Sequence, residues 1–304
     1  MKIAVIGSGA MGCLYGAYLS KDNEVIMIDG WKDNVEKINE NGITLDEENG
    51  SYTYKAKAYE DSRDINDVDL VIVFVKSINT ISELNKHKNI FKEDTIVLTL
   101  QNGYGNDEDI MKFVKKENII IGTSSHSSIM VGPGHAKHAG CGTTHISTVV
   151  GNQDNAEKVA EIFNKARFIT EVNNDVKRLI WSKLFVNIAI NPLTTILKMN
   201  NGAIAENDSV KEIAAKLVKE AVIVANKEGM NFTFEEAFNN ALDVSYKTRL
   251  SKSSMYQDTL RKAKTEIDKI NGTVVRLSSK YNIECPYNSM ICDLVHAIES
   301  EYIK

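Results

Sequence analysis

The chain has little proline and little cysteine for its 304 residues, and it has no excess of positive charge. Its three prolines, Pro133, Pro192 and Pro286, form no proline-rich linker that would mark a domain boundary. Its four cysteines are scattered and form no C-x-x-C pair, which argues against a disulfide framework and is typical of reduced thiols in a cytosol. With 36 Lys and Arg against 41 Asp and Glu, the formal charge is -5, so we expect no nucleic-acid partner.

The sequence also lacks a long uninterrupted apolar run. Its longest apolar stretch, Leu184–Leu197, is shorter than a membrane span and contains Asn187 and Asn191, whose amides are costly in lipid. A strand-like apolar run starts directly at Met1, which leaves no room for a signal peptide. We therefore expect a soluble, cytoplasmic protein with no membrane partner.

The first half of the sequence alternates short apolar runs with helical patterns, as in strands joined by crossover helices in a parallel sheet. The expected strands are Lys2–Ile6, Glu24–Ile28, Leu70–Val75, Ile96–Leu100 and Ile119–Thr123. We expect further, antiparallel strands between Ala136 and Ser147. The fold class predicted for this half is α/β.

From about residue 174 onward, apolar residues recur at helical intervals, as in the windows Ser209–Glu228 and Ser253–Lys280. A chain of 304 residues is also near the size at which one core divides into two. We therefore expect an α/β domain over residues 1–173 and an all-helical domain over residues 174–304.

A G-x-G-x-x-G motif follows the first expected strand directly and precedes a helix-compatible segment. Its residues are Gly7, Ser8, Gly9, Ala10, Met11 and Gly12. In a strand-to-helix turn, the first glycine makes the tight turn, the second lets the backbone approach a pyrophosphate, and the third lets helix and strand pack closely. The phosphates would lie at the helix N-terminus. The motif predicts a Rossmann-type dinucleotide site, with a glycine-rich turn that binds no ligand as the alternative.

Three charged residues bear on the choice of cofactor. Asp29 ends the second expected strand, where an acid usually binds the adenosine ribose hydroxyls of NAD. Lys32 and Lys76 could instead each reach the 2′-phosphate of NADP, since Lys76 follows a strand at its carboxyl end. Asp29 as a helix cap and Lys32 as a solvated surface charge are the structural alternatives. The choice between NADH and NADPH stays open on this evidence.

Polar residues at helical spacing suggest a catalytic site in the second half. Lys183, Asn187 and Asn191 recur at intervals of four among apolar residues, so they share one helical face. Ketone reduction needs a proton donor, and a lysine among apolar neighbours has a lowered pKa that suits this role. Alternatively, Lys183 extends its ammonium into solvent, and Asn191 caps a helix that has Pro192 at its first position.

A second polar group lies further along the chain. On a single helix, Ser254, Asp258 and Glu266 would come close to a common stripe. A carboxylate that faces Lys183 would hold its ammonium and could accept a hydrogen bond from a substrate hydroxyl. On spacing alone, Glu266 could equally be a surface charge.

Two other patterns contain residues that suit a binding site. Asn102, in the turn after the strand Ile96–Leu100, could touch the nicotinamide ribose or the substrate, although Asn-Gly is also a common structural turn. The residues His135, His138, Cys141 and His145 have zinc-like spacing. They follow a Gly-Pro-Gly turn in an expected strand, where residues three apart point to opposite faces, so we predict no metal there.

Several of these segments together resemble the ketopantoate reductase family, over residues 1 to about 300. The motifs that carry the resemblance are the glycine motif Gly7–Gly12, Gln101-Asn102-Gly103, Gly122-Thr123 with His126, Lys183-Leu184 with Asn187, Asn191-Pro192-Leu193-Thr194, Ser253-Ser254-Met255 with Gln257-Asp258, and Thr265-Glu266-Ile267-Asp268 with Ile270-Asn271-Gly272. Their order and the spacing from Ser254 to Glu266 both match.

The resemblance implies an N-terminal Rossmann domain and a helical C-terminal domain similar to that of 6-phosphogluconate dehydrogenases. It implies NADPH-dependent reduction of 2-dehydropantoate (ketopantoate) to pantoate, the step that supplies pantothenate and coenzyme A. By this resemblance, Lys183 is the general acid and Glu266 binds the substrate's terminal hydroxyl. The resemblance also implies substrate contacts by Asn187, Asn191, Ser254 and Asn102. It implies cofactor contacts by Asn102, which lies beside the nicotinamide, and by Glu266.

The sequence departs from the family pattern after the second strand, where many members carry an arginine for the 2′-phosphate. This chain has Asp29-Gly30-Trp31-Lys32 instead, which makes NADH possible. The alternatives to ketopantoate reduction are reduction of another small 2-oxo acid and a nicotinamide-binding sensor without turnover. A homodimer is the default expectation for a soluble enzyme.

Overall fold

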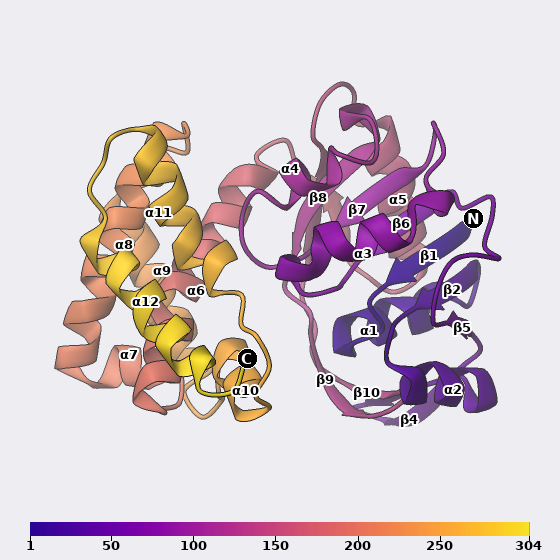
Figure 1. Cartoon of the computed structure of the whole chain (residues 1–304), viewed down its shortest axis with the longest axis horizontal. Helices are drawn as coiled ribbons and strands as arrows, with labels where there is room; N and C mark the ends of the chain where they lie inside the picture. The colour runs from indigo at the N-terminus through magenta and orange to yellow at the C-terminus, as the bar shows by residue number, and fades with distance from the viewer. Residues whose placement is uncertain (304) are drawn as a thin grey trace. The chain divides into compact units, whose positions relative to one another are not determined.

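The computed structural model describes residues 1–303, and the chain divides into two compact units (Figure 1). The α/β unit comprises Met1–Gln101 and Asn106–Val176. The helical unit comprises Asn102–Gly105 and the chain from Lys177 onward. Each unit has a hydrophobic core of its own.

An eight-stranded sheet forms the centre of the α/β unit, with the strand order β12-β11-β8-β7-β6-β1-β2-β5. Its strands are β1 (Lys2–Ile6), β2 (Glu24–Ile28), β5 (Lys57–Tyr59), β6 (Leu70–Val73), β7 (Ile96–Thr99), β8 (Ile119–Ser124), β11 (Thr144–Thr148) and β12 (Thr170–Val172). The five strands expected from the sequence are confirmed within two residues at each end. They pair in parallel, whereas β11 runs antiparallel to β8.

The helices and short 3-10 turns of this unit follow the strands along the chain. They are α1 (Ala10–Leu19), α2 (Lys32–Asn41), η1 (Ser77–Asn79), α3 (Thr80–Lys86), η2 (Lys88–Ile90), α4 (Asn106–Ile110), η3 (Lys116–Asn118) and α5 (Asp154–Lys165). Every residue of β6 and β7 is buried, which explains their uninterrupted apolar sequence.

A second, four-stranded sheet has the order β4-β3-β10-β9. Its strands are β3 (Ile43–Glu47), β4 (Gly50–Tyr54), β9 (Ser127–Gly132) and β10 (His135–Gly140). β9 and β10 form an antiparallel hairpin, and Gly134 in its turn has a positive φ of 67°. The expected antiparallel strands after Gly134 are therefore confirmed, but they are divided between two sheets.

The helical unit is built from seven helices over its described residues. They are α6 (Val176–Leu197), α7 (Ala203–Glu206), α8 (Asp208–Lys227), α9 (Phe234–Lys247), α10 (Ser254–Leu260), α11 (Asn271–Lys280) and α12 (Pro286–Ser300), with the 3-10 turn η4 (Ile267–Lys269) before α11. Side chains of Asn207, Thr233 and Ser253 cap α8, α9 and α10 by accepting a backbone N–H each.

Helix α6 is long and apolar enough, by length and composition, to cross a membrane. It extends further toward its N-terminus than the apolar stretch noted in the sequence, which is why it passes this test. Within the protein, 67% of the apolar window is buried, with Trp181 and Phe185 among the largest fully buried side chains. The core helix of a folded domain meets the same criterion, so this is weak evidence for a membrane segment.

The expectation of a single helix through Ser254, Asp258 and Glu266 is wrong, because the chain breaks after α10. Lys262 adopts a left-handed φ of 56°, and Ala263 N–H donates back to the Asp258 carbonyl at 2.9 Å, which ends the helix. Thr265 N–H then donates to the carboxylate of Glu299 on α12 at 2.6 Å. This long-range contact directs the following residues into η4 instead of a continuous helix.

Helix α6 continues through Pro192, so Asn191 does not cap a new helix there. A proline inside a helix leaves the carbonyl four residues earlier without its usual donor, and here that carbonyl belongs to Ile188. Asn271, the first residue of α11, donates its side-chain amide to Ile188 O at 3.5 Å and to Asn288 Oδ1 at 3.0 Å. A buried amide thus connects α6, α11 and α12.

Candidate active site

The three glycines of the G-x-G-x-x-G motif occupy three different environments. Gly7 has a φ of +98°, and a Cβ there would lie 2.5 Å from the backbone nitrogen of Val75. A Cβ on Gly12 would lie 1.9 Å from the Gly7 carbonyl oxygen, so only glycine allows this approach of helix to strand. A Cβ on Gly9 would meet nothing within 4 Å. The space beside Gly9 is where a ligand could approach the backbone.

The N-terminus of α1 adjoins this space. Gly9 is the N-cap and offers no side-chain cap, while Ala10 and Met11 begin the helix, so the first N–H groups have no capping side chain. The buried hydroxyl of Ser8 has no hydrogen-bond partner among the described residues. Free N–H groups, an orphaned hydroxyl and an open approach at Gly9 together fit a pyrophosphate.

Asp29, at the end of β2, is fixed against the glycine turn. Its carboxylate accepts hydrogen bonds from Ser8 N–H at 2.5 Å and from Trp31 N–H at 2.9 Å. The N-cap of α2 is Trp31, so Asp29 does not act as the cap of that helix. Its position beside the glycine turn is the one from which an acid binds ribose hydroxyls in this fold.

The two lysines weighed for a 2′-phosphate have different surroundings. Lys32 is exposed and lies 3.8 Å from the Glu36 carboxylate in an i,i+4 pair on α2. Lys76 is the N-cap of η1, three residues beyond β6, and is partly buried. The ion pair with Glu36 reduces the positive charge that Lys32 offers to an anion.

Lys183, Asn187 and Asn191 all lie on α6, as their spacing predicts. Lys183 and Asn187 are partly buried, and Asn191 is only 5% exposed. Burial lowers the pKa of Lys183, and the negative charge of Glu266 partly opposes this shift. The structure therefore brings Glu266 into electrostatic range of Lys183.

Glu266 lies in the break between α10 and α11 and does not share a helix with Ser254. It is 5% exposed and immediately precedes η4. Ser254 is exposed and begins α10, whose N-cap, Ser253, lies 2.8 Å from the Thr194 hydroxyl of α6. The prediction that Ser254, Asp258 and Glu266 form one helical stripe is wrong because the helix ends at Leu260.

Asn102 belongs to the helical unit, although it follows a strand of the α/β unit. Its neighbour Gly103 has a φ of +91°, and a Cβ there would lie 2.5 Å from the Lys269 carbonyl oxygen. Tyr104 N–H also donates to that oxygen, at 3.4 Å. The segment 102–105 thus packs against η4, the turn that begins one residue after Glu266.

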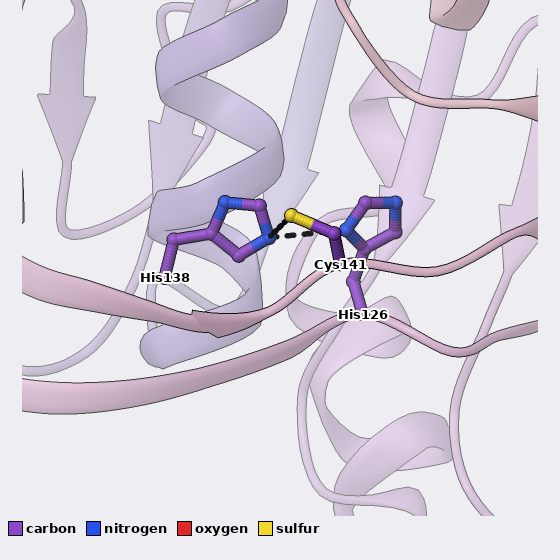
Figure 2. Close-up of side chains that lie close together, drawn as sticks. All are labelled: His126, His138 and Cys141. Carbon is purple, nitrogen blue, oxygen red and sulfur yellow. Dashed lines mark hydrogen bonds between the residues drawn. The ribbon is translucent and has the colours of Figure 1, made fainter. Parts of the chain in front are cut away.

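Two histidines of the zinc-like pattern form carboxylate pairs elsewhere. His135 lies 2.9 Å from Asp46, and His145 lies 3.4 Å from Glu171. His138 and Cys141 instead lie beside His126 (Figure 2). Of these three residues, His126 is the one in the link between β8 and β9. Sequence spacing did not reveal this third partner, because strand pairing brings it close from outside the His135–His145 segment.

Two family models match the chain, "Ketopantoate reductase PanE/ApbA" over residues 3–151 and "Ketopantoate reductase PanE/ApbA C terminal" over residues 175–299. A 2-dehydropantoate 2-reductase of Streptococcus pyogenes serotype M18 (strain MGAS8232) is 33% identical over 305 residues, which cover 99% of this chain and 98% of that protein. This chain belongs to the ketopantoate reductase family. The predicted family is confirmed, as is the fold class of a Rossmann-type domain followed by a helical domain.

Other members and neighbours share nearly the whole chain. A 2-dehydropantoate 2-reductase of Pyrococcus horikoshii is 36% identical over 301 residues, which cover 99% of this chain and 98% of that protein. The ternary structure of D-mandelate dehydrogenase with NADH and anilino(oxo)acetate has a TM-score of 0.94 and 32% identity, with 99% of each chain covered. As a member of the ketopantoate reductase family, this chain is a nicotinamide-dinucleotide oxidoreductase.

Proposed function

We propose that this ketopantoate reductase family member reduces 2-dehydropantoate to pantoate in the cytoplasm, the step that supplies pantothenate and coenzyme A. The observation that carries the proposal is the partly buried Lys183, whose pKa is lowered by burial, with Glu266 in electrostatic range of it. Relatives of 33% and 36% identity that carry the name 2-dehydropantoate 2-reductase support it.

Lys183 acts as the proton donor. A bound nicotinamide supplies the hydride for this reaction class. The substrate's ketone oxygen gains negative charge as its carbon is reduced, and the Lys183 ammonium neutralises that charge by giving up a proton. Burial disfavours the ammonium form and so makes the proton easier to transfer near neutral pH.

The neighbouring groups bind and orient the substrate. Asn187 and Asn191 lie one and two turns along α6 from Lys183 and offer amide groups without adding charge. Glu266 accepts a hydrogen bond from the substrate's distal hydroxyl and holds the Lys183 ammonium through its negative charge. Ser254 and Asn102 complete the proposed contacts, with Asn102 beside the nicotinamide.

We further propose that NADH is the preferred cofactor. The Asp29 carboxylate lies against the glycine turn, where it accepts hydrogen bonds from the ribose hydroxyls but repels a 2′-phosphate. Lys32 is already paired with Glu36. The similar D-mandelate dehydrogenase was solved with NADH, which supports the same choice.

A second candidate is reduction of a different 2-oxo acid, favoured by the likeness to D-mandelate dehydrogenase. Phenylglyoxylate, the 2-oxo acid formed by oxidation of mandelate, has no distal hydroxyl and so cannot donate a hydrogen bond to Glu266. Substrate discrimination at Glu266 therefore separates the two candidates.

The test compares kcat/KM for ketopantoate and for phenylglyoxylate in the wild-type protein and in Glu266→Gln. Ketopantoate reduction predicts a wild-type preference for ketopantoate that falls by at least about tenfold in the variant, since a buried charge-assisted hydrogen bond is lost. A wild-type preference for phenylglyoxylate that Glu266→Gln leaves unchanged would establish the second candidate.

A further inference from the structure

Three side chains with metal-binding atoms converge in the α/β unit. Figure 2 shows the imidazole rings of His126 and His138 facing each other, with the Cys141 sulfur beside the space between them. His126 Nδ1 lies 3.1 Å from His138 Nε2, and Cys141 Sγ lies 3.7 Å from the same nitrogen. One ligand atom from each residue falls within 4.8 Å of the others.

The two separations from His138 Nε2 are close to those between ligands of one tetrahedral zinc ion. Zn–N bonds of about 2.0 Å and Zn–S bonds of about 2.3 Å separate two nitrogens by roughly 3.3 Å, and a nitrogen from a sulfur by roughly 3.5 Å. The observed distances of 3.1 and 3.7 Å differ from these by only a few tenths of an ångström. Cys141 is exposed and therefore has room to adjust toward the ion.

Aromatic neighbours hold both histidine rings in place. His126 packs edge-on with Phe168, with ring centroids 5.2 Å apart. His138 packs edge-on with Tyr18, with ring centroids 5.8 Å apart.

A hydrogen bond behind His138 selects its ligand nitrogen. The Tyr18 hydroxyl lies 3.2 Å from His138 Nδ1, and it also interacts with the carboxylate of Glu47. When His138 donates its Nδ1–H to the Tyr18 oxygen, its Nε2 carries the lone pair that can bind a metal. Metal-binding histidines characteristically use such a partner on the second nitrogen.

We propose that His126 Nδ1, His138 Nε2 and Cys141 Sγ form a Zn²⁺ site with a fourth position open to solvent. Two imidazoles and a thiolate are zinc-type ligands and do not suit Mg²⁺ or Ca²⁺. On binding, the Cys141 thiol loses its proton to solvent and its sulfur becomes the third protein ligand. The site does not depend on which 2-oxo acid the enzyme reduces.

This site differs from the four-residue pattern that the sequence argued against. His135 and His138 do lie on one strand with an odd spacing, and His135 pairs with Asp46 instead. Cys141 lies just beyond the end of β10, where side chains no longer alternate between two faces of a strand. His126 directly precedes β9, the strand that pairs with β10.

The test is a zinc titration of the full-length, chelator-treated protein against a chromogenic chelator. The wild type should bind one zinc per chain, and Cys141→Ser and His126→Asn should each weaken binding by at least about tenfold. His145→Asn is the matched control, because His145 pairs with Glu171 outside the site, and it should bind zinc as the wild type does.

Cobalt substitution gives a second readout that does not depend on affinity. The cobalt-loaded wild type should show a thiolate-to-metal charge-transfer absorption that Cys141→Ser lacks, while circular dichroism confirms that this exposed-site variant is folded. Absence of stoichiometric zinc in the wild type, or unchanged zinc affinity in Cys141→Ser, would overturn the proposal.

Discussion

Lys183 combines burial with a nearby carboxylate, and the two effects act on its pKa in opposite directions. As the proposed general acid, Lys183 must be protonated, so activity should fall as pH rises through its lowered pKa. Lys183→Ala should reduce kcat by about 10²–10⁴-fold, the usual contribution of general acid catalysis. The measurement is the steady-state rate of ketopantoate reduction.

Glu266→Gln provides the matching pH experiment. Its carboxylate raises the pKa of Lys183, so removing the charge should lower that pKa further. The basic limb of the kcat profile should consequently move to lower pH in the variant. A limb that stays in place, or moves to higher pH, would show that Glu266 does not act on the proton donor.

The glycine turn allows stability and binding to be separated at single residues. Gly9 has a φ of -66° and open space where a Cβ would lie, so Gly9→Ala should leave the thermal midpoint nearly unchanged. The added methyl would occupy the approach of the pyrophosphate, so the Kd for NADH should rise by at least about tenfold. NADH fluorescence titration measures this change.

Gly12→Ala is the matched comparison. Its Cβ would lie 1.9 Å from the Gly7 carbonyl oxygen, so the variant should lose about 1–3 kcal/mol of stability from overpacking. Urea unfolding tests this difference between the two glycines. Equal destabilisation by both substitutions would contradict the distinct roles assigned to them.

These residues could be selected from the sequence because local spacing fixes their setting. The glycine motif follows a strand, and Lys183, Asn187 and Asn191 recur at one helical turn each. Spacing alone leaves Glu266 open as a surface charge, and the helical stripe predicted for it is wrong because α10 ends before it. His126 was not linked to His138 and Cys141, since only strand pairing brings them together.

At the scale of elements, α6 depends on a partner for the carbonyl that Pro192 leaves without a donor. Asn271 supplies that donor to Ile188 O and also donates to Asn288. Asn271→Ala should therefore leave buried acceptors unsatisfied and cost about 1–3 kcal/mol. The free energy of unfolding in urea measures the loss.

Asn239, exposed on α9, is the matched control for Asn271. Asn239→Ala should change stability by less than about 0.5 kcal/mol, as expected of a surface substitution. If Asn271→Ala were as mild as the control, the connection of α6 to α11 and α12 would not support the helical unit.

Elements with strong local patterns were predicted well, and elements set by distant contacts were not. The window Ser209–Glu228 matches α8 closely because its amphipathic period is uninterrupted. Strand β4 has four exposed residues out of five and so carries no alternation to detect. The break after α10 could not be predicted, because the Glu299 side chain that binds the Thr265 backbone lies in a remote helix.

At the scale of the whole molecule, the change from β/α alternation to helical periodicity predicted two parts of the chain. The structure assigns Asn102–Gly105 to the helical unit, although the surrounding sequence belongs to the α/β unit. Sequence periodicity could not show this, because the assignment follows from the contact of Gly103 and Tyr104 with Lys269. The proposed binding residues therefore include Asn102, from a segment that interrupts the α/β unit.

The central claim is that this enzyme reduces ketopantoate and that Asp29 makes NADH the preferred cofactor. The most direct test is the loss of nicotinamide absorbance when the purified protein receives ketopantoate with NADH or with NADPH in parallel. Rapid oxidation of NADH and slower oxidation of NADPH are expected, with the higher kcat/KM for NADH. A higher kcat/KM for NADPH would contradict the role of Asp29, and oxidation of neither cofactor would contradict the proposed substrate.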